Sequence, residues 1–298
     1  MTSPVFDKPV RAEQRSETRL NDVIRKPGIA HVLLTLAACS LSMGAILLTR
    51  GTGDVAAVWP VNAILLIVVL KWPKAEWPSL FGCLFIGTLL ANVVIGDPWV
   101  RSLILAIANS LEVLIVALIL SQHSAPNITR KSGILRLFAA SLVACSISTP
   151  IALAGLAMTG AALPVQDSAL WFFGDILGLL LFAPLLWALL TKRETGNDLG
   201  WMSVLEGLLV VVVTIGVFVQ SSYPLLFLVP PVLVPLTFRH GVRGAAVALL
   251  VVTMISIGFT YAGMGPTMLA EGGIVHHMLV LQAFLAANSY MALSLGAS

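Results

Sequence analysis

The chain is a succession of apolar segments, most of them as long as a membrane-crossing helix, separated by short loops. We place them at residues 29–49, 55–70, 76–95, 100–120, 133–157, 169–190, 203–220, 225–238, 243–262 and 275–295. About 20 helical residues cover the hydrocarbon core of a bilayer. Only 10% of the 298 residues are charged, too few to cover the surface of a water-soluble globule. The sequence therefore predicts an all-α, polytopic membrane helix bundle and excludes a water-soluble enzyme.

The positions of the Lys and Arg residues indicate how many segments cross. If the basic tail, residues 1–28, is cytoplasmic and ten segments cross, only Arg50 and Arg101 of the 17 Lys and Arg residues lie outside. Omitting the eighth segment alone would move Arg239 and Arg243 outside, against the positive-inside rule. We therefore predict ten crossings with both termini cytoplasmic, and eight as the alternative. Arg239 and Arg243 are expected to be topology determinants and inner-leaflet anchors.

Two segments are short for a membrane crossing. Residues 55–70 fall below the usual length, and residues 225–238 are also broken by Pro230, Pro231 and Pro235. Proline removes a backbone donor and clashes with the preceding helical turn. The backbone of the second segment must therefore find partners inside the bundle, and we expect it to be kinked or re-entrant.

Polar side chains inside apolar segments are costly, so each needs a partner or a water-filled cavity. The candidates are Asn62, Asn92, Asn109, Glu112, Asp175 and Asn288. Asn109 and Glu112 are three residues apart and project from one face of a helix. No Lys or Arg clearly lies at the depth of Glu112.

Asp175 lies between Gly174 and Gly178, whose spacing gives a flat face for close helix packing. For Glu112 and Asp175, a ligand site and structural hydrogen bonds between helices are equally open. For Asn62, Asn92 and Asn109, hydrogen bonds between helices are the favoured interpretation.

Nothing in the sequence indicates metal, cofactor or nucleic-acid binding. The three cysteines lie far apart within apolar segments, which is not the spacing of a metal site. The adjacent His276 and His277 are weak evidence for a metal. A net charge of +3 is too small to indicate nucleic acid, and no nucleotide-binding, protease or hydrolase motif occurs. We therefore predict no metal, no cofactor and no catalytic residues.

Several short motifs follow one another in a recognisable order. They are VWPVNA at 58–63, GTLLAN at 87–92, ANSLEV at 108–113, FGDILGLLLFAP at 173–184, FRHGVRG at 238–244 and LQAF at 281–284. This ordered set, over about residues 30–295, resembles the MASE1 family of bacterial integral-membrane sensor domains. The resemblance implies a sensory module at residues 29–298. Such a module is usually followed by a cytoplasmic diguanylate cyclase, phosphodiesterase or histidine kinase, and no such output domain is expected within the chain.

The leading functional hypothesis is a signal-input domain of the bacterial inner membrane whose last helix passes a signal to a cytoplasmic effector. Its partners would be the lipid bilayer and that effector, which could be another membrane protein, and a homodimer is compatible with it. The candidate sensing residues are Trp59, Pro60, Asn62, Asn92, Asn109, Glu112 and Asp175. The alternative is a small-solute or proton-coupled transporter in which Glu112 and Asp175 relay protons. An intramembrane enzyme lacks any nucleophile–base pair or metal site.

Overall fold

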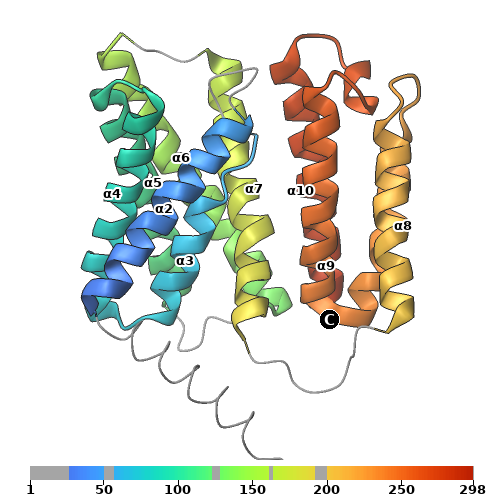
Figure 1. The fold of residues 1–298 in the computed structure, drawn as a ribbon, viewed down its shortest axis with the longest axis horizontal. Coiled ribbons are helices and arrows are strands. Elements are labelled where there is room, and N and C mark those ends of the chain that lie inside the picture. The colour runs from blue at the N-terminus through green and yellow to red at the C-terminus, as the bar shows by residue number, and fades with distance from the viewer. Residues whose placement is uncertain (1–26, 50–56, 123–127, 161–163, 192–199, 298) are drawn as a thin grey trace, which may run out of the picture.

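The structure, a computed structural model, describes residues 27–49, 57–122, 128–160, 164–191 and 200–297. These residues form helices and loops, with no strand among them (Figure 1). The long helices are α2 (Pro27–Thr49), α4 (Trp77–Ile95), α5 (Trp99–Leu120), α6 (Lys131–Met158), α7 (Val165–Leu190), α8 (Trp201–Phe218), α9 (Val229–Tyr261) and α10 (Ile274–Gly296). The shorter ones are α3 (Val61–Lys71) and the 3₁₀ turns η1 (Lys74–Glu76), η2 (Leu225–Leu228) and η3 (Pro266–Leu269). The tail predicted at residues 1–28 lies almost entirely outside the described residues.

Local sequence signals set several of the helix boundaries. Pro98 and Pro164 immediately precede α5 and α7, where a fixed φ suits the helix start and no backbone donor is lost. Helix α4 ends at Gly96, which has a φ of 106° that glycine adopts without steric strain. Apolar residues fill the segments between these boundaries. In a medium without water such segments form helices, because a helix pairs its own backbone groups.

The helices form two groups that share α7. One core lies among α2 to α7, and a second lies among α7 to α10. Leu179 and Leu180 of α7 belong to the first core, whereas Leu177 and Leu181 belong to the second. Figure 1 shows α7 between the two groups. Side chains on opposite faces of this one helix therefore connect the two halves of the molecule.

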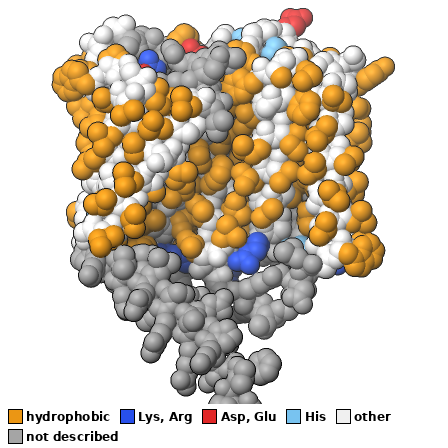
Figure 2. Space-filling model, viewed as in Figure 1, with side chains coloured by type: hydrophobic (Ala, Val, Ile, Leu, Met, Phe, Trp, Pro, Cys, Tyr) orange, Lys and Arg blue, Asp and Glu red, His pale blue; other side chains and the backbone are white. Residues whose placement is uncertain are grey.

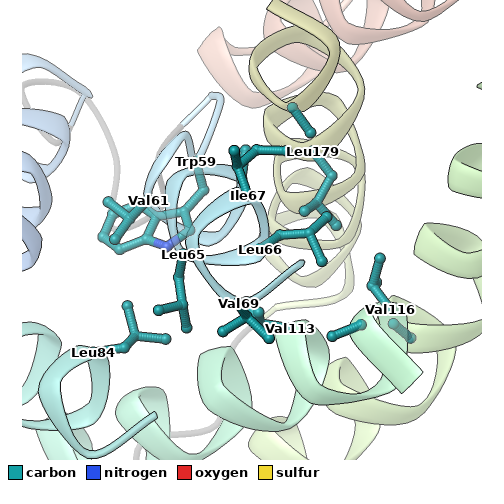
Figure 3. Close-up of a cluster of buried hydrophobic side chains, with 14 of the residues drawn as sticks. Trp59, Val61, Leu65, Leu66, Ile67, Val69, Leu84, Val113, Val116 and Leu179 are labelled. Atoms are coloured by element: carbon teal, nitrogen blue, oxygen red, sulfur yellow. The ribbon is translucent and has the colours of Figure 1, made fainter. Parts of the chain in front are cut away.

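The short helix α3 lies within the first group and is preceded by non-helical chain. The chain at Ala57–Pro60 is not helical, and α3 begins only at Val61. Eleven residues of helix are about 16 Å long, half the hydrocarbon core. Most of α3 is buried, and Figure 3 shows Leu65, Leu66 and their neighbours packed among the surrounding helices.

Helix α9 is folded at Gly241 rather than at its prolines. Gly241 has φ 59° and ψ −147°, which no helical residue adopts. A Cβ on Gly244 would lie 2.4 Å from the carbonyl oxygen of Leu236, although eight residues of straight helix would be about 12 Å long. The two halves of α9 therefore fold back on each other. Pro230 and Pro231 lie in the first turn, where the helix leaves N–H groups unpaired in any case.

Eight helices among the described residues are long and apolar enough to cross a membrane. That number omits α3 and counts the folded α9 once. The predicted ten crossings, and the cytoplasmic location of both termini, stay predictions.

The outer surface is suited to contact with lipid. Figure 2 shows a broad band of apolar side chains over the face in view, with charged side chains confined to its upper and lower rims. Many large apolar side chains are exposed, among them Leu47, Val94, Val212 and Met254. Trp99 and Trp201 are also exposed, at the first residues of α5 and α8. Apolar surface of this extent, with tryptophans at helix ends, is typical of a protein that crosses a bilayer.

Candidate functional site

Polar side chains from four helices meet inside the first group of helices. Asn62 comes from α3, Glu112 from α5, Ser148 from α6 and Asp175 from α7. The exposed fractions of Asn62, Glu112 and Asp175 are 0%, 1% and 3%. We call the set formed by Asn62, Asn109, Glu112, Ser148 and Asp175 the polar cluster.

The amide of Asn62 links α3 to α5. Its Nδ2 donates to Oδ1 of Asn109 at 3.0 Å and to Oε1 of Glu112 at 2.9 Å. Both hydrogens of the amide are therefore used, and both acceptors lie on the face of α5 that their spacing predicts. Asn62 occupies the first turn of α3, so the position at which α3 begins determines whether the amide reaches α5.

Glu112 is the centre of the cluster. Its Oε2 accepts a hydrogen bond from Oγ of Ser148 at 3.5 Å, and the Cys145 thiol and the Asp175 carboxyl lie beside the Glu112 carboxyl. Trp171, one helical turn earlier in α7, lies beside Asp175. None of these partners is basic. A carboxylate has only acceptor oxygens, so a hydrogen bond between the two carboxyl groups requires a proton on one of them.

The glycines on either side of Asp175 hold the chain that leads into α3. The backbone N–H of Trp59 donates to the carbonyl oxygen of Gly174 at 3.1 Å. A Cβ on Gly178 would lie 1.9 Å from the carbonyl oxygen of Trp59, so no other residue fits there. A close approach does occur at Gly178. Its partner is the non-helical chain before α3, however, and not a neighbouring helix.

Trp59 and Pro60 support the cluster without belonging to it. The Trp59 side chain is buried in the first core, and Figure 3 shows it beside Val61 and Leu65 at the start of α3. Pro60 immediately precedes α3. The hydrogen bond of the Trp59 backbone to α7 therefore sets where α3 starts, and with it the position of Asn62.

Three of the predicted residues lie outside the polar cluster. The buried side chain of Asn92 donates to the carbonyl oxygen of Thr88 at 2.8 Å, within its own helix α4. Arg239 forms an ion pair with Glu206, with 2.7 Å between Nη2 and Oε1. Arg243 donates to the carbonyl oxygen of Ala188 near the end of α7. Both arginines therefore make contacts within the protein, and Arg239 is still 44% exposed.

Sequence reasoning overlooked several partners of the cluster. Cys145 and Ser148 lie three residues apart in α6, so they share a helix face, but such small polar residues are common fillers of apolar helices. Trp171 gave no signal beyond its position near a segment end. Gln282 of α10 is buried. Its amide in an apolar segment was the feature by which the sequence could have identified it. Within the described ranges, no group of three or more His, Cys, Asp and Glu side chains is placed to hold a metal.

These observations define a class of protein: a multi-pass membrane helix bundle with a buried polar centre near the junction of its two halves. The family model for MASE1 matches residues 30–298, and the chain belongs to this family of membrane-associated sensor domains. The resemblance given by the ordered motifs is thus confirmed. No curated protein and no solved structure matches the chain.

Proposed function

We propose that the polar cluster is the sensing element of a signal-input domain, and that it changes its packing when a ligand, a lipid or a partner protein binds. The observation that carries the proposal is the amide of Asn62, which joins α3 to Asn109 and Glu112. Leaving one buried polar group without its partner costs about 1–3 kcal/mol. A signal that offers other partners to these groups could therefore favour a second arrangement of α3, α5 and α7.

The output would leave through α10. With the ten crossings that the distribution of Lys and Arg favours, the end of α10 lies on the cytoplasmic side of a bacterial inner membrane. The short α3 and the folded α9 supply the two crossings beyond the eight long helices. There α10 would act on an effector such as a diguanylate cyclase or a histidine kinase, in the same polypeptide or in a separate chain. A homodimer is compatible with this arrangement.

The test compares two buried polar residues in the full chain, with a cyclase reporter attached after residue 298. We expect Asp175→Ala to change the reporter output while the protein still inserts, because it removes a member of the cluster. Asn92→Ala is the matched control, because the side chain of Asn92 hydrogen-bonds within its own helix. Unchanged output from a well-inserted Asp175→Ala protein rejects the cluster as the sensing element. A reporter found outside the cytoplasm rejects direct coupling through α10.

A second candidate function is favoured by the proximity of two buried carboxyl groups, those of Glu112 and Asp175. Such a pair could relay protons in a small-solute transporter. Purified protein in proteoliposomes distinguishes the two functions. Proton-coupled flux that disappears in Glu112→Gln would establish the transporter.

A further inference from the structure

Gln282 of α10 connects the second group of helices to the segments that position the polar cluster. It is 2% exposed. Its Nε2 donates to the carbonyl oxygen of Ala57 at 2.8 Å and to that of Leu170 at 2.9 Å. These acceptors are 225 and 112 residues away along the chain. One side chain thus joins three segments: α10, the chain before α3, and the first turns of α7.

Both acceptors are close to residues that hold the cluster in place. Ala57 is two residues before Trp59, whose backbone is bonded to Gly174. Leu170 is one helical turn before Gly174, and it adjoins Trp171, which lies beside Asp175. A displacement of either segment therefore moves a carbonyl group that Gln282 holds.

The chemistry of the side chain fixes its orientation. Two carbonyl oxygens require a donor group between them, and the NH₂ end of the amide supplies two hydrogens. Turning the amide over would place Oε1 against both carbonyls, so the observed orientation is the favourable one. Oε1 is buried and has no hydrogen-bond partner. The free energy of this contact therefore depends on keeping both acceptors in position.

We propose that Gln282 is the positioning residue that couples the polar cluster to α10. The inference rests on the proposed function, because it names the route by which a change in the cluster reaches the output helix. When the chain at Ala57 and the turn at Leu170 move together, α10 follows through the amide. When they separate, one of the two hydrogen bonds breaks and α10 is released from that segment.

The experiment is a double-mutant cycle on the full chain in lipid nanodiscs. Asp175→Ala perturbs the cluster, and Gln282→Met removes the donor while keeping the length of the side chain. Hydrogen exchange is measured on peptides covering residues 285–297 at the end of α10. We expect Asp175→Ala to change this exchange by at least about fivefold when Gln282 is present, the lower end of typical coupling between sites. In the Gln282→Met protein, we expect the change to fall within about twofold.

Asn288→Met is the matched control on the same helix. Asn288 is a buried amide, but its Nδ2 donates to the carbonyl oxygen of Phe284 within α10. The control should leave the fivefold response intact, which a general loosening of α10 would not. If Gln282→Met fails to insert, Gln282→Asn takes its place. It retains the amide but is one methylene too short to reach both carbonyls, and it should reduce the response.

Two results overturn the proposal, and they differ. An equal response to Asp175→Ala with and without Gln282 removes Gln282 from the route and leaves the cluster as the sensing element. No response to Asp175→Ala in either protein contradicts the proposed function, and the inference that rests on it also fails.

Discussion

Gly178→Ala tests whether the contact between α7 and the chain before α3 stabilises the fold. The new Cβ would lie 1.9 Å from the carbonyl oxygen and 2.5 Å from the carbonyl carbon of Trp59. Ordinary contact begins at about 3.4 Å, so the Trp59 carbonyl would have to move by about 1.5 Å. Both atoms belong to the backbone, so no flexible side chain can relieve the clash. The shift would also weaken the hydrogen bond from Trp59 to Gly174.

The magnitude follows from three contributions. Overpacking a well-filled site costs about 1–3 kcal/mol. Losing the backbone hydrogen bond adds about 0.5–1.5 kcal/mol. The higher helix propensity of alanine offsets about 1 kcal/mol of this loss. We therefore expect the free energy of unfolding to fall by about 1–3 kcal/mol, and the melting temperature to fall with it.

The assay is thermal unfolding of the purified protein in nanodiscs, followed by tryptophan fluorescence. Gly207→Ala is the matched control, because Gly207 lies in α8 with no atom within 4 Å of an added Cβ. It should be neutral or slightly stabilising. If Gly178→Ala melts at or above the temperature of Gly207→Ala, the backbone of Trp59 does not contact α7 at Gly178.

Three further substitutions test other contacts in nanodiscs, the first two by thermal stability and the third by hydrogen exchange. Asn62→Leu removes the donor to Glu112 and should lower the free energy of unfolding by about 1–3 kcal/mol. Gly241→Ala forces a side chain into a backbone conformation essentially restricted to glycine and should cost about 1–3 kcal/mol. Arg243→Gln shortens the reach to the carbonyl of Ala188 and should increase hydrogen exchange at the end of α7.

The first two of these substitutions each have a control in the chain. Asn92→Leu removes an amide bonded only within α4, so it should cost less than Asn62→Leu. Gly200→Ala changes a glycine with a φ of −70° and no atom near the added Cβ, so it should cost less than Gly241→Ala. A loss in either control equal to that of its partner would contradict the argument.

The sequence was sufficient to predict the membrane class and the position of nearly every helix. Long apolar segments in a bilayer have few alternatives to helix, so their bounds can be recognised locally. The same holds for Asn109 and Glu112, whose shared face follows from their spacing. The ordered motifs also led correctly to the MASE1 family.

Contacts between helices could not be predicted in this way. Nothing local to Asn92 distinguishes it from Asn62, yet Asn62 alone reaches α5, because the contact of Trp59 with α7 fixes where α3 begins. The prolines at 230–235 suggested a break in that segment. The chain instead folds at Gly241, where only glycine tolerates the reversal. Pro230 and Pro231 lie in the first turn of α9, where proline costs little, and Pro235 is accommodated inside the helix.

The fold in α9 has a consequence for how α10 can move. Gly296, the last residue of α10, packs directly on Gly241, and a Cβ on Gly296 would lie 2.7 Å from the carbonyl carbon of Gly241. The two backbones touch with no side chain between them. This contact therefore limits sliding of α10 along its axis but permits α10 to tilt about it. Gln282 lies about 21 Å from Gly296 along the axis of α10. A displacement there would change the direction in which the chain leaves the bundle more than the place where it leaves.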